Sequence, residues 1–117
     1  MFDPRPLPTG SLPDDLDQRL ADGRVFGCTA VTVRRPRSFG AIAGCRLIVA
    51  EDAVALRFVG RTYAFVVAGE GIVETSRSRI WGLRVRLMSD LVDATVTPND
   101  EEDALAALRT WGWVSAA

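Results

Sequence analysis

Histidine and lysine are both absent from this chain of 117 residues, and cysteine occurs only twice. Without histidine, the chain lacks the commonest general base and the commonest metal ligand. The two cysteines, Cys28 and Cys45, form no C-x-x-C motif, so we expect no zinc site. All 14 basic residues are arginine, a bias that a GC-rich genome explains well. We therefore expect no bound metal and no cofactor.

Long apolar runs are missing as well. The nearest candidate, residues 39–50, is shorter than the ~18 residues that a membrane span needs, and it contains Arg46. The N-terminus has no basic-then-apolar leader. We therefore expect no transmembrane segment and a cytoplasmic location. In a reducing compartment the two cysteines are expected to be buried thiols, although a symmetric hairpin about Pro36-Arg37 would place them opposite each other.

The charge is close to balanced but unevenly distributed. Residues 24–86 hold eleven arginines against four acids, whereas residues 1–23 hold two against five and residues 87–117 hold one against six. One interpretation is structural: acids favour helix N-termini, and arginines lie on solvated strand faces. The other is a basic face that attracts anions. The composition leaves both open.

The chain is long enough for one domain. We expect residues 1–10, which contain three prolines, to form an extended arm, and residues 11–117 to form the domain, with its core in 24–112. Ser11 is predicted to cap a short helix that ends at Gly23. Its apolar stripe, Leu12, Leu16 and Leu20, should lie against the sheet or against a partner.

From Arg24 the apolar residues alternate with a period of two, which predicts strands. The first strand, 25–35, places Phe26 and Cys28 out of phase with Val31 and Val33, so we expect a bulge or bend near Gly27. Three two-residue turns then predict hairpin registers that share one inward face. The predicted pairs are Phe58–Tyr63, Leu56–Phe65 and Val54–Val67 about Gly60-Arg61; Val49–Val54, Leu47–Leu56 and Cys45–Phe58 about Glu51-Asp52; and Leu87–Val92, Val85–Ala94 and Leu83–Val96 about Ser89-Asp90.

A final helix is predicted over residues 97–111. Thr97 is the expected N-cap, Pro98 suits the first turn, and Gly112 ends the helix. Its apolar stripe, Ala104, Leu105, Leu108 and Trp111, should seal the open end of a mostly β core. The predicted class is therefore mainly β: a seven-stranded antiparallel barrel or roll, capped by a C-terminal helix and preceded by a short N-terminal helix.

No group of residues points to catalysis. Serines and threonines are plentiful, but no histidine or lysine is present to activate them. The acidic pairs Asp14/Asp15, Glu51/Asp52 and Glu101/Glu102 fall at helix starts or turns. We therefore expect a protein that is not an enzyme.

The arginines are the only candidates for a site. Arg34, Arg35 and Arg37 lie in the loop after the first strand, and Arg77 and Arg79 form an alternating pair. An anion site needs several guanidinium groups that converge, which a loop permits. A pI near 5.4 and the lack of interleaved aromatics argue against nucleic acid as a partner.

The order of elements resembles the pleckstrin-homology (PH) superfold, and more narrowly the PH-like domains of bacteria. The resemblance covers residues 24–112 and is carried by 46–57, 63–65 with 72–73, 82–87 and 98–112. It implies a binding or scaffold domain without catalysis. In lipid-binding members a basic first loop holds phosphoinositide headgroups, and Arg34, Arg35 and Arg37 occupy that loop here. The loop contains no lysine, and a bacterial source would argue against phosphoinositides.

The expected function is a non-catalytic binding or scaffold module that contacts a protein partner or a second copy of itself. A homodimer would form through an exposed strand edge or the N-terminal helix. The alternative is weak binding of an anionic membrane or a phosphate headgroup through the loop of Arg34–Arg37.

Overall fold

The computed structural model describes residues 15–35 and 38–114. The predicted arm, Ser11, Leu12 and the turn at Pro36-Arg37 lie outside these residues. The described elements are, in order, α1 (Leu16–Leu20), β1 (Arg24–Arg35), β2 (Phe39–Ala41), β3 (Cys45–Val49), β4 (Ala53–Phe58), β5 (Arg61–Val67), β6 (Ile72–Ser78), β7 (Gly82–Met88), β8 (Asp93–Pro98) and α2 (Glu101–Thr110).

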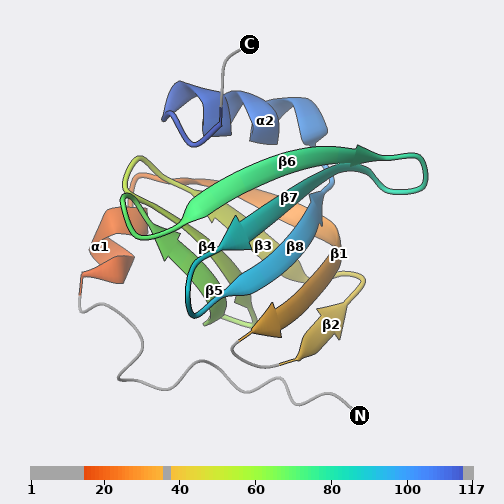
Figure 1. Ribbon diagram of the computed structural model, residues 1–117, viewed down its shortest axis with the longest axis horizontal. Helices are drawn as coiled ribbons and strands as arrows, with labels where there is room; N and C mark the ends of the chain where they lie inside the picture. The colour runs from red at the N-terminus through yellow and green to blue at the C-terminus, as the bar shows by residue number, and fades with distance from the viewer. Residues whose placement is uncertain (1–14, 36–37, 115–117) are drawn as a thin grey trace.

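The strands form one antiparallel sheet in the order β5-β4-β3-β1-β8-β7-β6, and β2 pairs with β1 beside this path. The sheet curls into a half-barrel, with α2 along one end (Figure 1). The predicted class, mainly β with a C-terminal helix and a short N-terminal helix, is confirmed. The described residues form eight strands rather than the predicted seven, because the segment between β1 and the Glu51-Asp52 turn forms two strands, β2 and β3. Gly44 lies between them with φ of +84°, a conformation that favours glycine.

β1 is the strand shared by both halves of the sheet. It pairs with β3 through its first half and with β2 through its second, while β8 lies along its other side. Its register with β8 shifts between Cys28 and Ala30, which allows both Cys28 and Val31 to point inward. The predicted bulge is confirmed, two residues beyond Gly27.

The three predicted hairpin registers have different outcomes. The β3–β4 register is confirmed: Val49 faces Val54, Leu47 faces Leu56, and Cys45 faces Phe58. The β7–β8 register is wrong by two residues. Ser89 and Val92 close the turn, Leu87 pairs with Ala94 and Val85 pairs with Val96, so the inward face is unchanged.

The β4–β5 register is also wrong, and here the inward face changes. The turn consists of Val59 and Gly60, both with positive φ, rather than Gly60-Arg61. A bulge between Leu56 and Arg57 then shifts the pairing, so Leu56 faces Ala64 and Val54 faces Val66. As a result Phe65, predicted to point into the main core, packs on the opposite side of the sheet.

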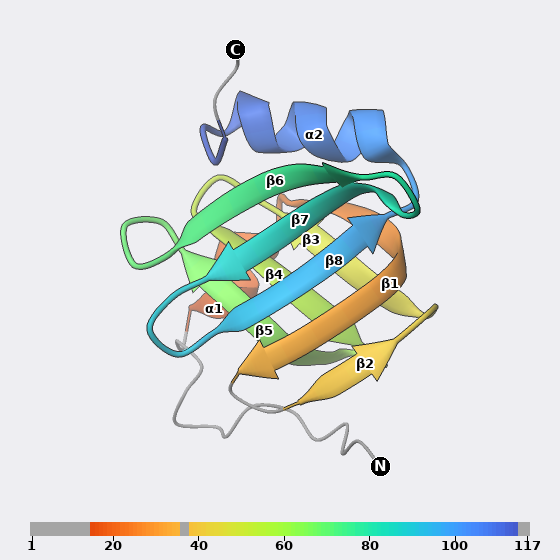
Figure 2. The same cartoon turned by 45° about the vertical axis from the view of Figure 1, so that its right-hand side comes forward.

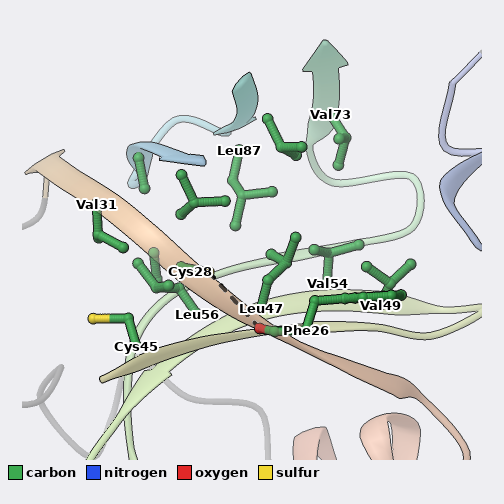
Figure 3. Close-up of a cluster of buried hydrophobic side chains, with 14 of the residues drawn as sticks. Phe26, Cys28, Val31, Cys45, Leu47, Val49, Val54, Leu56, Val73 and Leu87 are labelled. Atoms are coloured by element: carbon green, nitrogen blue, oxygen red, sulfur yellow. Dashed lines mark hydrogen bonds between the residues drawn. The ribbon is translucent and has the colours of Figure 1, made fainter. Parts of the chain in front are cut away.

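The main core fills the inside of the half-barrel. Figure 3 shows side chains of β1, β3 and β4 pointing toward those of β6 and β7 across it. Leu47, Leu56 and Leu87 are fully buried. This packing is the largest source of stability, since apolar area removed from water is the dominant favourable term in folding.

The outer face of β3 and β4 is buried as well, because α1 covers it. Leu16 and Leu20 pack on Ile48, Ala50, Ala53, Ala55 and Phe65 in a second, smaller core. The alanines leave room for the helix to approach the sheet closely. Asp17 forms an ion pair with Arg57 of β4. Of the two predicted positions for this helix, against the sheet or against a partner, the structure shows the first.

Helix α2 begins later than predicted. β8 remains paired with β1 as far as Thr97 and Pro98, and the Asn99 N–H donates to the Gly27 carbonyl. The N-cap is therefore Asp100, whose Oδ1 accepts from the Asp103 N–H at 3.4 Å, and the predicted cap at Thr97 is wrong. The end is confirmed: Gly112 has φ of +77° and its N–H donates to the Arg109 carbonyl.

The predicted sealing of the half-barrel by α2 is confirmed. Leu108 is fully buried, and Leu105 and Trp111 are partly buried against the main core. Trp113 adds an anchor that the sequence did not reveal, because its indole Nε1–H donates to the Ala50 carbonyl at 2.7 Å. The chain after α2 is thereby held to the β3–β4 turn.

Candidate functional site

The predicted arginine site is divided between two ends of the sheet. Arg34 and Arg35 end β1, where Arg35 faces Asp93 at the start of β8. Arg77 is near the end of β6, and Arg79 follows in the β6–β7 loop. Because Asp93 faces Met88 and Met88 faces Ile72, the start of β6 lies at the Arg35 end and Arg77 lies at the other. The two groups do not converge. Arg37 lies outside the described residues.

Asp93 partly neutralises the first group. Arg86 donates from Nε and Nη2 to the two carboxylate oxygens of Asp93, each at 3.0 Å. This hydrogen-bonded pair holds the pKa of Asp93 below its usual value, and the charges of Arg35 and Arg34 lower it further. Sequence reasoning did not single out Asp93. The correct β7–β8 register would have placed it diagonally opposite Arg86.

A groove lies between β6 and α2, in the part of the molecule where Figure 2 shows the helix running beside this strand. Its volume is 260 Å³. It combines an apolar floor with hydroxyl and guanidinium groups. The lining residues are Thr75, Ser76, Arg77, Leu83, Leu105, Arg109 and Val114. Of these only Arg77 was a predicted site residue.

Glu101 connects the groove to the start of the helix. Its Oε1 accepts from the Leu83 N–H at 2.8 Å, and its Oε2 is 3.6 Å from Nη1 of Arg77. Gly82 makes this contact possible, since a Cβ there would lie 1.8 Å from Glu101 Oε1. The first turn of α2 is thus hydrogen-bonded to the start of β7.

Large apolar side chains are exposed at several turns. Val59 of the β4–β5 turn and Leu91 of the β7–β8 turn are 78% and 68% exposed. Both turns lie on the side of the sheet away from α2 (Figures 1 and 2). Val59 is also strained, because its φ of +52° is rare for a β-branched residue. At the β6–β7 loop, beside the start of α2, Ile80 and Trp81 are exposed too.

Cys28 and Cys45 face each other in the β1–β3 pairing, as the symmetric hairpin suggested. Both are free and buried, as expected. Burial raises the pKa of Cys28 to about 12 and that of Cys45 to about 11. The thiolate is the reactive form, so these side chains act as small apolar core residues.

Within residues 15–35 and 38–114, no three Cys, Asp or Glu side chains gather as metal ligands would. The same residues include no helix that is both long and apolar enough to cross a membrane. Comparisons with protein-family models, curated proteins and solved structures find no match to this chain.

Proposed function

We propose that this chain is a non-catalytic binding module of the PH-like class whose partner is another protein. The observation that supports the proposal is the open half-barrel: among the described residues the sheet ends in β5 and β6, each paired with a strand on one side only. An unpaired edge presents backbone N–H and C=O groups that another chain can satisfy. A second copy of this chain belongs to the same class of partner.

The test uses the full chain as bait in its native host. The proteins it captures are compared with those captured by a second bait, in which Thr75→Pro blocks the β6 edge. Partners captured by the intact chain and lost with T75P would support the proposal. Circular dichroism must first show that T75P is folded; Thr75→Lys, which adds charge to the edge without removing an N–H, replaces it otherwise. Equal capture by intact and blocked baits would contradict docking at this edge.

Binding to an anionic surface is a second candidate, favoured by the exposed Val59 and Leu91. The two turns that carry these residues lie at the same end of the half-barrel as the end of β1, which carries the exposed Arg34 and Arg35 (Figures 1 and 2). Apolar turns beside guanidinium groups suit a bilayer that carries anionic headgroups. Retaining valine at a strained φ is understandable if its side chain contacts such a surface.

Flotation with vesicles of phosphatidylcholine alone, or mixed with phosphatidylserine, tests this candidate at low and high salt. We expect binding only to the anionic vesicles, weakened by salt and by the double change Arg34→Gln and Arg35→Gln. Val59→Asn should weaken binding while raising the unfolding free energy by about 1 kcal/mol, because asparagine tolerates positive φ. Vesicle binding that is unchanged by salt and by both sets of substitutions would contradict binding through this surface.

A further inference from the structure

Among the described residues no strand pairs with the outer side of β6, and α2 runs beside it (Figure 2). An isolated bridge joins Ala68 and Gly71 just before the strand begins, and the side chain of Arg77 contacts Glu101 of α2. Glu74, Thr75, Ser76 and Arg77 are exposed. A strand of seven residues can therefore accept backbone hydrogen bonds from an added segment of similar length.

The groove lies on the side of this edge that faces α2. Arg77 is opposite Leu83 in the β6–β7 pairing, so the two residues share the face that turns toward the helix. An added strand would follow the same pleat, and every second side chain would point into the groove. There it would meet Leu83 and Leu105 at the floor and Arg109 on the helix.

The charges of the groove select the occupant. Its described lining contains two guanidinium groups and no carboxylate. Arg77 is 65% exposed, and Glu101, its neighbour at 3.6 Å, is also bonded to the Leu83 N–H. Acidic side chains of an added strand would therefore find cations in reach.

An anionic bilayer fits this side of the molecule poorly. The first turn of α2 carries Glu101, Glu102 and Asp103, and the N-cap is Asp100. These carboxylates lie near the β6–β7 loop, because Glu101 contacts both Arg77 and the start of β7. They would repel anionic headgroups brought up along the helix. An acidic peptide meets this repulsion where Glu101 lies beside Arg77, whereas Arg109 lies in the last turn of α2, at the other end of the helix from these carboxylates.

Resting on the proposed function, we propose that an extended acidic peptide segment of a partner protein adds to the β6 edge as a further strand. Alternate acidic side chains contact Arg77 and Arg109, and an aliphatic side chain between them packs on Leu83 and Leu105. Backbone hydrogen bonds to β6 align the peptide, and the side chains of the groove determine which peptide sequences bind.

The probe is a fluorescein-labelled heptapeptide, Thr-Glu-Thr-Leu-Thr-Glu-Thr, which places two glutamates and one leucine on one face. Fluorescence anisotropy should show saturable binding to the full chain. Replacing both glutamates of the peptide by glutamine should weaken binding by about tenfold or more. The double variant Arg77→Gln and Arg109→Gln should do the same, whereas Arg61→Gln, at an exposed arginine outside the groove, should not.

Two further peptides test strand addition itself. One is N-methylated at the amides of its even-numbered residues, and the other at the amides of its odd-numbered residues. Only one set of amides points toward β6, so one peptide should lose binding and the other keep it. NMR shifts of the protein should concentrate in residues 72–78 and 101–110. Absence of binding at about 1 mM probe, equal binding by the Arg77/Arg109 variant, or equal binding of both methylated peptides would overturn the proposal.

The failure of this inference is distinguishable from the failure of the proposed function. If the bait that carries Arg77→Gln and Arg109→Gln captures the same native partners as the intact chain, the module binds protein but the groove does not select an acidic segment. If native partners are captured by neither bait and the probe still binds, the groove accepts acidic peptides, and the proposed biological function fails.

Discussion

Thr97 lies in β8 and Asp100 is the N-cap of α2, three residues further along the chain. Asp100 accepts a hydrogen bond from the first turn of the helix. Thr97 is 3% exposed in β8, and its Oγ1 has no hydrogen-bond partner among the described residues. The hydroxyl that would suit a cap therefore belongs to a buried strand position, where burying it carries a free-energy penalty.

We predict that Thr97→Val leaves the free energy of unfolding unchanged or raises it, because valine has nearly the same shape and removes an unsatisfied hydroxyl. Asp100→Ala should lower it by about 0.5–2 kcal/mol through loss of the cap. Urea denaturation of both variants measures the two changes. If Thr97→Val lowers the free energy of unfolding and Asp100→Ala does not, Thr97 rather than Asp100 caps the helix.

The buried thiols lead to a prediction about pH. Their pKa values in the folded chain, about 12 for Cys28 and about 11 for Cys45, lie above the ordinary value of 9.0. The unfolded chain therefore releases these protons at lower pH than the folded chain. Their contribution to stability is complete below pH 9 and declines as pH rises from 9 through about 11 for Cys45 and about 12 for Cys28.

We expect the free energy of unfolding to fall over this alkaline range, and thiol reagents at pH 8 to label the cysteines only after unfolding. The double variant Cys28→Ala and Cys45→Ala is the control. Any decrease in the free energy of unfolding at alkaline pH that this variant still shows comes from other titratable groups. Rapid labelling of the native chain at pH 8 would show that the thiols are accessible.

At the scale of elements, the sequence predicted which side of a strand is buried better than it predicted which residues pair across neighbouring strands. In β7 the alternation of arginine with Leu83, Val85 and Leu87 determined which side is buried, and a register error of two residues did not alter it. The β4–β5 turn was harder, because glycine at position 60 suits either of two turns. The bulge after Leu56 then brings Phe65 to the side of the sheet that Leu16 and Leu20 cover, a contact between residues distant in sequence.

The groove could not have been predicted for the same reason. Its residues come from β6, β7, α2 and the chain after α2. Local patterns place Leu105 and Arg109 on a helix but do not say which strand that helix accompanies. The predicted arginines were chosen by clustering in sequence, whereas the sheet registers bring Arg77 toward Glu101 and separate it from Arg34.

Docking of α2 is open to a direct test. Leu108 is fully buried in the main core, so Leu108→Ala should lower the free energy of unfolding by about 2–5 kcal/mol. Ala106 is exposed on the same helix, and Ala106→Ser is the matched control, for which we expect a change of less than about 1 kcal/mol. An unchanged denaturation midpoint for Leu108→Ala would mean that the helix is not docked.

At the scale of the whole molecule, the two predicted routes to a homodimer are no longer equivalent. Leu16 and Leu20 are buried against this chain's own β3 and β4, so the described part of the N-terminal helix has no apolar face left for a second copy. Edge pairing remains. If a second copy uses β6, it must compete with the acidic peptide for the same backbone groups.

We therefore predict weak self-association through β6 that the acidic heptapeptide reverses. Light scattering should give a mass near 12.7 kDa at low micromolar concentration, a higher average mass as concentration rises, and a return to the monomer mass when the peptide is added. Thr75→Lys should suppress the rise, because like charges would then face each other across the paired edges. A dimer that persists with saturating peptide would place the contact on another surface. A constant monomer mass would remove the homodimer and leave the peptide groove as the remaining use of this edge.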